Sequence, residues 1–279
     1  MVAANYTFSA SNGGIILPLS GPAGDPLAGV CKNAGTNPGV RSEAMADRLF
    51  DEWQVYEKLL VNDYRDHRAF VGRLQEEIQA RFKRPIAMLD LGCGDVSPIL
   101  PLLARLPVSR YVGVDESEAA LALAAHHLDT LHCPHQLIKG DLLAALRNID
   151  QTFDLILASF SLHHLGNVAD KQATLEVAAS RLNPDGFLAV IDVFCGDSEV
   201  REQYLERWIA HARSRYADLQ PAEFELLFDH VRKRDFPVSL ACFRALGAEV
   251  GMPQFEVLLQ DHARLNGLVT FSRDITRPD

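Results

Sequence analysis

Residues 89–95, Leu89-Asp90-Leu91-Gly92-Cys93-Gly94-Asp95, decide the fold class of this 279-residue chain. The apolar run that leads into them, 85–91, stops at Gly92, which is typical of a buried strand that ends in a turn. A Gly-x-Gly turn lets a ligand approach the backbone closely, because neither glycine has a Cβ. The residue three positions after Gly94 is Ser97, so the dinucleotide fingerprint Gly-x-Gly-x-x-Gly is not met. A nicotinamide oxidoreductase is therefore disfavoured.

Further apolar runs follow this strand, and helix-forming segments separate them. The runs cover 111–114, 135–138, 153–158 and 186–193, and the helical segments cover 98–106, 118–128 and 171–182. Apolar strands alternating with crossover helices predict a parallel sheet that is buried on both faces. The last two runs, 255–259 and 267–271, are joined too closely for a crossover, so we expect them to pair antiparallel. The sequence predicts an α/β fold, a mainly parallel Rossmann-like sheet with a terminal antiparallel hairpin.

The rest of the chain divides around this sheet. Residues 1–43 are rich in Gly, Pro, Ser, Asn and Ala and lack a sustained period, which predicts a flexible N-terminal tail. Helical spacing of apolar residues over 44–84 predicts two helices, or one broken near 61–63. Residues 85–279 then form the sheet domain, with a helical insert at about 198–247 before the hairpin.

Composition narrows the classes of partner. The formal net charge of -10 repels a phosphate backbone, so we expect no nucleic acid. No apolar run approaches the roughly 18 residues of a membrane span, and no basic residue precedes the short apolar stretch at 15–19. The five scattered cysteines are typical of free thiols in a reducing compartment. The sequence predicts a cytoplasmic protein without a membrane anchor.

Acidic residues stand at the ends of the second and third predicted strands. Asp115 comes 21 positions after Gly94, where a carboxylate can accept hydrogen bonds from both hydroxyls of a ribose. The alternative for Asp115 is a helix N-cap. The third strand ends in Gly140-Asp141-Leu142, where a carboxylate and an exposed amide could read an adenine edge. Because such strand ends share one crevice, a nucleoside without phosphates fits them better than a dinucleotide.

Five motifs together carry a family resemblance. They are Asp90-Leu91-Gly92-Cys93-Gly94, Gly113-Val114-Asp115, Gly140-Asp141-Leu142, Phe153-Asp154-Leu155-Ile156 and Leu182-Asn183-Pro184-Asp185-Gly186. In this order they resemble the successive motifs of class I S-adenosylmethionine-dependent methyltransferases. The resemblance is firm over residues 86–194 and looser over the hairpin. It implies a seven-stranded sheet whose last strand is inserted antiparallel.

The resemblance also implies a cofactor and its contacts. S-adenosylmethionine would lie with its methionine part against Gly92 and Gly94, its ribose on Asp115, and its adenine on Asp141 and Leu142. Ser159 and Phe160 would line the sulfonium and the acceptor. We expect three neighbours of these motifs to complete the cofactor site, namely Asp90, Cys93 and Glu116.

The chemistry that such a cofactor supports needs few protein groups. A sulfonium is an activated methyl donor, so in-line SN2 transfer depends mainly on holding donor and acceptor close and aligned. A base helps when the acceptor must lose a proton, and His163 and His164 follow the fourth strand at the right place. The alternative is that this histidine pair is only a feature of a loop or helix start. Candidates for acceptor contacts are Tyr56, Tyr64, His67 and Asp192, against the alternative of core packing.

Two choices stay open at this stage. The acceptor is expected to be a small molecule, with a protein or nucleic-acid methyltransferase, or a non-catalytic domain that binds the cofactor or a partner, as alternatives. We expect a monomer or a homodimer. The histidines and cysteine at 126–135 do not match a standard zinc spacing, so we expect no metal.

Overall fold

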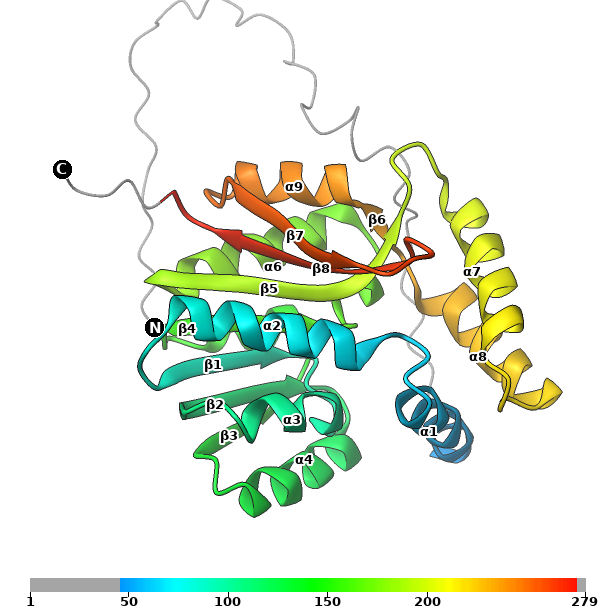
Figure 1. Ribbon diagram of the computed structural model, residues 1–279, viewed down its shortest axis with the longest axis horizontal. Helices are drawn as coiled ribbons and strands as arrows, with labels where there is room; N and C mark the ends of the chain where they lie inside the picture. The colour runs from blue at the N-terminus through cyan, green and yellow to red at the C-terminus, as the bar shows by residue number, and fades with distance from the viewer. Residues whose placement is uncertain (1–45, 275–279) are drawn as a thin grey trace, which may run out of the picture.

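The computed structural model describes residues 46–274, with side chains from Gln54 onward, so the predicted tail at 1–43 lies outside the described residues. Figure 1 shows the arrangement of the elements. The helices are α1 (Ala46–Val61), α2 (His67–Arg81), α3 (Leu100–Leu103), α4 (Glu118–Thr130), α5 (Leu142–Asn148), α6 (Val168–Arg181), α7 (Arg201–Arg215), α8 (Pro221–Arg234) and α9 (Leu240–Glu249), with 3-10 turns η1 (Ser97–Ile99) and η2 (Leu162–His164). The strands are β1 (Ile86–Leu91), β2 (Val108–Asp115), β3 (His135–Lys139), β4 (Phe153–Ser159), β5 (Leu182–Cys195), β6 (Val238–Ser239), β7 (Gln254–Gln260) and β8 (Asn266–Ser272).

The main sheet has the order β3-β2-β1-β4-β5-β8-β7. Strands β1 to β5 run parallel, and β8 is antiparallel to both of its neighbours, β5 and β7. The predicted seven-stranded, mainly parallel sheet with an inserted antiparallel last strand is therefore confirmed. The two-residue strand β6 pairs with the end of β5, off the main path.

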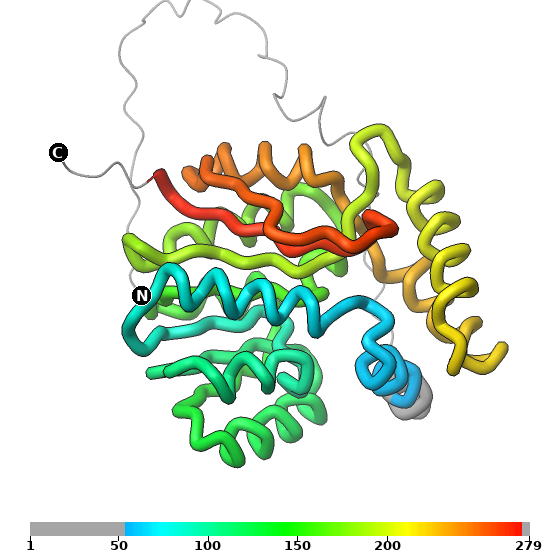
Figure 2. The backbone as a smooth tube through the Cα atoms, in the orientation of Figure 1, coloured from blue at the N-terminus to red at the C-terminus, as the bar shows by residue number. Residues whose placement is uncertain are grey.

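Helices cover both faces of the sheet (Figures 1 and 2). Adjacent residues of β1 show why: Met88 packs in a cluster with α2, α3 and α4, whereas Leu89 packs in a second cluster with α5, α6 and α9. Both side chains are fully buried. The continuous apolar pattern of the parallel strands follows from this burial on two faces.

A third apolar cluster lies beyond the carboxyl end of β5, where α1, α7 and α8 gather (Figure 1). Val55 of α1, Trp208 of α7 and Phe228 of α8 are its buried members. The Lys58 ammonium of α1 also contacts the Glu223 carboxylate of α8 at 2.6 Å. The predicted helical insert is thus a layer at the end of the sheet, and α1 packs against it, while α2 packs on a face of the sheet.

Three details differ from the sequence predictions. Helix α5 was not predicted, because its seven residues are too few to show a period. Near the end of the predicted helical insert, residues Val238 and Ser239 are not helical but pair with Phe194 and Cys195, so helix α9 begins at Leu240. Cys93, Cys133 and Cys195 are free thiols, but Cys242 is disulfide-bonded, so the prediction of free thiols is wrong at that position. Over residues 46–274, the helices are too short or too polar to span a bilayer.

Candidate active site

A cavity of about 330 Å³ lies at the carboxyl ends of β1, β2 and β4. Val55 and Leu59 of α1 and Leu226 and Leu227 of α8 form its apolar cover. Its polar wall comes from the ends of β1, β2 and β4 with the segments that follow them, and from α1, α2, the segment between them and α8. It consists of Tyr56, Arg65, His67, Asp90, Asp95, Asp115, Ser117, Ser159, His163, His164 and His230. The cavity is therefore bounded by the sheet on one side and by helices on the other, as ligand sites of open α/β sheets are.

The glycine turn after β1 forms part of this wall. Gly92 and Gly94 have φ angles of 75° and 52°, a region that favours glycine. A Cβ added to Gly92 would lie 2.5 Å from the Cβ of Ser161, whereas a Cβ at Gly94 would meet no atom within 4 Å. Gly92 is thus needed for packing, and Gly94 leaves open space in the cavity wall.

Asp115 at the end of β2 braces this turn. Its Oδ2 accepts a hydrogen bond of 2.8 Å from the Gly94 amide, and its Oδ1 accepts one of 2.8 Å from the Ser117 amide. The Ser117 hydroxyl, and not Asp115, is the N-cap of α4, since it accepts from the Ala120 amide. Asp115 keeps further lone pairs for a ligand and lines the cavity.

Asp90, the last acid within β1, is buried below the turn. Its Oδ2 accepts a hydrogen bond of 2.8 Å from the Tyr111 hydroxyl, while its Oδ1 has no hydrogen-bond partner in the described part of the chain. Burial raises the pKa of Asp90 to about 7; the Tyr111 hydrogen bond opposes this rise, and the charge of Asp115 adds a smaller contribution to it. Burial also raises the pKa of the neighbouring Cys93 thiol, which lines the cavity as well.

Three of the predicted cofactor residues lie outside the lining of this cavity. Asp141 is the N-cap of α5, where its Oδ1 accepts a hydrogen bond of 2.8 Å from the Ala144 amide. Leu142 packs against the core cluster on the α5 face of the sheet. Glu116 is exposed, directly after Asp115.

Ser159 is the last residue of β4 and Phe160 follows it, and both line the cavity. Phe160 has a φ of 51°, and its amide donates to the Ile191 carbonyl at 2.7 Å. Its ring is packed between His67, at a centroid distance of 4.7 Å, and the Arg65 guanidinium, 5.2 Å from the ring centroid. Phe160 therefore connects the end of the sheet with the segment between α1 and α2.

His163 and Asp192 form a buried pair next to the cavity. The His163 Nδ1 donates to Asp192 Oδ1 at 2.5 Å, and the His163 amide donates to Asp192 Oδ2 at 3.0 Å. The two side chains are 2 % and 4 % exposed. Asp192 does not line the cavity, so the structure places this predicted acceptor contact behind His163.

His164 faces the cavity more openly, with 41 % of its side chain exposed. Its ring centroid lies 4.0 Å from that of His163 and 5.6 Å from that of His230. Desolvation in the cavity wall, together with the neighbouring His163 and His230, lowers the pKa of His164 well below its ordinary value. Desolvation likewise lowers the pKa of His230 to about 4, so these two rings are neutral near pH 7.

The predicted acceptor residues of the N-terminal helices separate into two groups. Tyr56 and His67 line the cavity. Burial raises the pKa of Tyr56 and lowers the pKa of His67 to about 3, so both are neutral. Tyr64 lies outside the lining, stacked on Tyr216 at 4.5 Å with its hydroxyl accepting a hydrogen bond from the Asp218 amide.

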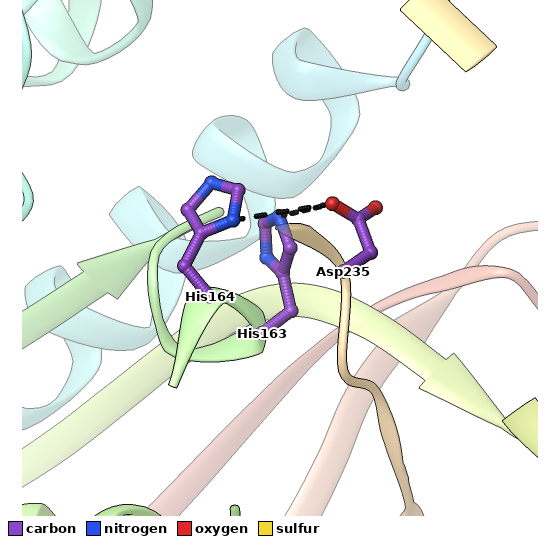
Figure 3. A group of neighbouring side chains, drawn as sticks. All are labelled: His163, His164 and Asp235. Carbon is purple, nitrogen blue, oxygen red and sulfur yellow. Dashed lines mark ion pairs between the residues drawn. The ribbon is translucent and has the colours of Figure 1, made fainter. Parts of the chain in front are cut away.

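Sequence reasoning missed two polar residues of this region, Arg65 and Asp235. Arg65 lines the cavity, and it has no carboxylate within ion-pair distance among residues 54–274. Asp235, at the end of α8, is 1 % exposed and approaches His163 and His164 (Figure 3). No motif marks these residues, because Arg65 lies between α1 and α2 and Asp235 at the end of α8, and their place depends on how these helices pack at the end of the sheet.

The comparisons with known proteins agree with this geometry. Residues 89–188 match the family model of a methyltransferase domain. Trans-aconitate 2-methyltransferase of Variovorax paradoxus strain S110 is 33 % identical over 133 residues, which are 47 % of each chain. Release factor glutamine methyltransferase of Geobacter sulfurreducens is 34 % identical over 84 residues, 30 % of this chain and 29 % of that one. The chain thus spans less than half the length of the curated relatives it matches.

Solved structures extend the likeness to most of the fold. Magnesium protoporphyrin IX methyltransferase from Synechocystis PCC 6803, solved with bound S-adenosylhomocysteine, has a TM-score of 0.55 at 15 % identity, over 81 % of this chain and 94 % of that one. At this identity the likeness shows the fold alone. Together with the matched family model, it shows that residues 89–188 form a methyltransferase domain, and it supports S-adenosylmethionine as the cofactor of that domain.

Proposed function

We propose that the protein transfers the methyl group of S-adenosylmethionine to a small-molecule acceptor inside the cavity between the sheet and the helical layer. The observation that carries this proposal is the continuity of the cavity, which joins Gly94 and Asp115 at one side to His163, His164 and Arg65 at the other. Its volume of about 330 Å³ is at the lower end of the range for small-molecule sites.

The cofactor side offers groups that suit a nucleoside with a cationic amino-acid tail. The Asp115 carboxylate would hold the ribose, and the open space beside Gly94 would admit the methionine part. When bound, the cofactor supplies an activated methyl group on a sulfonium. The chain itself would orient the two reactants and exclude water under the cover of α1 and α8.

The acceptor side carries one permanent positive charge. Arg65 is a guanidinium without an acidic partner in the described chain, and its neighbours in the cavity wall, His67, His164 and His230, are neutral near pH 7. An unpaired guanidinium in a cavity favours a ligand with a carboxylate or another anionic group. We propose an acceptor of this kind, with His163 and His164 as the candidates for accepting a proton.

Methyl transfer from radiolabelled S-adenosylmethionine to a panel of small carboxylic acids, phenols and amines tests the proposal. We expect turnover of acid-bearing acceptors, and a rise in KM of about tenfold or more in Arg65→Met, because charge-assisted hydrogen bonds contribute about 1.5–3 kcal/mol. Arg105→Met, at an exposed position, is the matched control. An unchanged KM for acid-bearing acceptors in Arg65→Met, or a preference of the unmodified chain for neutral acceptors, would contradict the anionic acceptor.

Two other outcomes would replace the proposal. Methylation of a peptide but of no small molecule would establish a protein methyltransferase. Cofactor binding without any transfer would favour a non-catalytic domain. A cytoplasmic location and a monomeric or homodimeric state remain predictions from the sequence.

A further inference from the structure

Three potential metal ligands converge at the acceptor side of the cavity (Figure 3). His163 Nε2 lies 3.6 Å from Asp235 Oδ1, and His164 Nδ1 lies 3.9 Å from the same oxygen. One ligand atom from each residue lies within 4.8 Å of the other two. Ligand atoms around a tetrahedral ion with bonds of about 2.1 Å are separated by about 3.4 Å, so closing this group needs only small side-chain movements.

Asp235 lacks the partners that a buried carboxylate needs. It is 1 % exposed, and neither carboxylate oxygen has a hydrogen-bond partner in the described part of the chain. Buried carboxylates in proteins are normally paired or bound to metal, because leaving one unpaired costs several kcal/mol. Asp235 Oδ1 faces His163 and His164, so whatever satisfies Asp235 must lie next to these two rings.

The position of the proton on the His163 ring limits which group can lie between His163 and Asp235. A carboxylate only accepts hydrogen bonds, so the short contact with Asp192 requires the proton on His163 Nδ1. In the neutral ring, Nε2 then presents a lone pair to the unpartnered oxygen of Asp235, and two acceptors face each other at 3.6 Å. A proton, carried by His163 or by Asp235, or a metal cation resolves this conflict. A proton would join only His163 and Asp235, whereas a metal ion would also explain why His164 lies close to the same oxygen.

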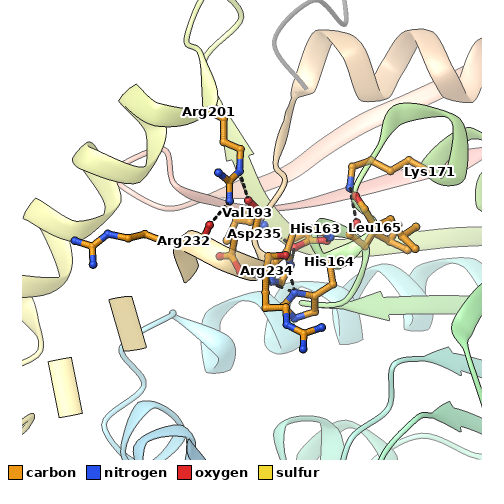
Figure 4. Close-up of polar contacts among 11 residues, drawn as sticks. His163, His164, Leu165, Lys171, Val193, Arg201, Arg232, Arg234 and Asp235 are labelled. Atoms are coloured by element: carbon orange, nitrogen blue, oxygen red, sulfur yellow. Dashed lines mark hydrogen bonds and ion pairs between the residues drawn. The ribbon is translucent and has the colours of Figure 1, made fainter. Parts of the chain in front are cut away.

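Hydrogen bonds from neighbouring residues hold the three potential ligands in place (Figure 4). Asp192 orients the His163 ring from behind, as a carboxylate does in carboxylate–histidine–metal sites. Lys171 Nζ donates to the carbonyls of Leu162 and Leu165 at 2.6 and 2.7 Å and so holds the turn that carries both histidines. Arg201 Nε donates to the Asp235 carbonyl at 2.7 Å, which holds the end of α8.

We propose that His163, His164 and Asp235 bind one divalent transition-metal ion of the zinc class. Two imidazoles and one carboxylate are the ligands that such ions use in catalytic sites, where a further position stays open. Both histidines line the cavity, so that position would face the acceptor. His164 would exchange its contact with the Arg234 carbonyl, 3.2 Å from Nδ1, for the metal. A metal there would hold an acceptor oxygen and favour its deprotonation, in place of a histidine base.

Metal binding can be measured without turnover. The purified chain is stripped with a chelator and titrated with Co²⁺ and with Zn²⁺, following the d–d absorption of Co²⁺ and the bound metal by mass spectrometry. We expect one equivalent per chain, and at least about tenfold weaker binding in Asp235→Asn, in His164→Ala and in the orienting variant Asp192→Asn. His126→Ala, which removes an exposed histidine outside the cluster, should bind as the unmodified chain does.

The same samples are tested for S-adenosylmethionine binding by calorimetry, which shows that each variant is folded. Stoichiometric metal that is lost in Asp235→Asn and His164→Ala supports the site. No stoichiometric binding by the unmodified chain, or binding that these two variants leave unchanged, overturns it. The cofactor titration separates this failure from a failure of the proposed methyl transfer, because the metal site does not rest on that function.

Discussion

The carboxylate of Asp115 accepts a 2.8 Å hydrogen bond from the backbone amide of Gly94, so the end of β2 holds the turn that follows β1. This contact joins the two sequence motifs that the cofactor prediction used. The Asp115 side chain therefore both holds the glycine turn and lines the cavity.

Asp115→Ala removes both roles at once. We expect the affinity for S-adenosylmethionine to fall by about tenfold to a hundredfold, which corresponds to a loss of about 1.5–3 kcal/mol for hydrogen bonds to a charged group. Asp115→Asn retains one acceptor and should lose less. Calorimetric titration of the three chains measures the difference, and unchanged affinity in Asp115→Ala would show that the ribose is not held there.

The two glycines of the turn should respond differently to a methyl group. Gly92→Ala places a Cβ 2.5 Å from Ser161 at a φ of 75°, so we expect a clear fall in melting temperature. Gly94→Ala meets no protein atom within 4 Å, and its positive φ costs about 1–2 kcal/mol. We expect Gly94→Ala to remain folded but to bind the cofactor poorly, as thermal unfolding and titration would show. Equal affinity in Gly94→Ala and the unmodified chain would place the ligand elsewhere.

Asp90 predicts a pH dependence of cofactor affinity. Its pKa of about 7 means that it is protonated in the free protein below that pH. A cationic sulfonium ligand favours the ionised form, so binding below pH 7 should release a proton, and affinity should rise with pH up to about 7, by at most about tenfold per pH unit. S-adenosylhomocysteine, which lacks the sulfonium charge, is the matched ligand and should show a weaker dependence. Equal dependence for both ligands, or one that survives in Asp90→Asn, would contradict this role.

Asp154 predicts how stability changes in acid. Burial opposes its ionisation, but hydrogen bonds from Arg84, the Ala87 amide and Asn183 outweigh burial and lower its pKa. A lowered folded-state pKa contributes stability above the ordinary value of about 3.9, and that stability is lost as the pH falls through the folded-state value. Asp154→Asn should therefore lower the free energy of unfolding by about 1–3 kcal/mol at pH 7 and by less near pH 3.5.

Urea unfolding at the two pH values measures this difference. Asp150→Asn is the control, because the Asp150 side chain is 99 % exposed. A penalty for Asp154→Asn that does not shrink in acid would mean that its charge contributes little.

The sheet could be predicted because its signals are local. A strand such as β1 is a short apolar run that stops at a glycine, and parallel strands place their carboxyl ends together whatever surrounds them. The positions of Gly92, Gly94 and Asp115 in the cavity wall follow from this rule. Helix α5 was missed because its seven residues are too few to show a period, and the Asp141 carboxylate, which was predicted as a ligand contact, is its N-cap in this structure.

The acceptor side could not be predicted in the same way. Asp235 reaches His163 only because α8 folds back from the insert, and the Phe236 amide then donates to the His163 carbonyl at 2.8 Å. Such contacts between distant segments depend on tertiary packing, which a periodic pattern does not encode. Asp192 was predicted from its place near the end of β5, but its alternation along the strand directs it to His163 instead of the cavity.

The most direct test of the proposed cofactor site is calorimetric titration of the unmodified chain with S-adenosylmethionine, S-adenosylhomocysteine and NAD. We expect micromolar binding of the first two ligands with one site per chain, and no measurable binding of NAD. Preference for NAD, or no binding of either sulfur compound, would contradict the assignment of this cavity as a methyl-donor site.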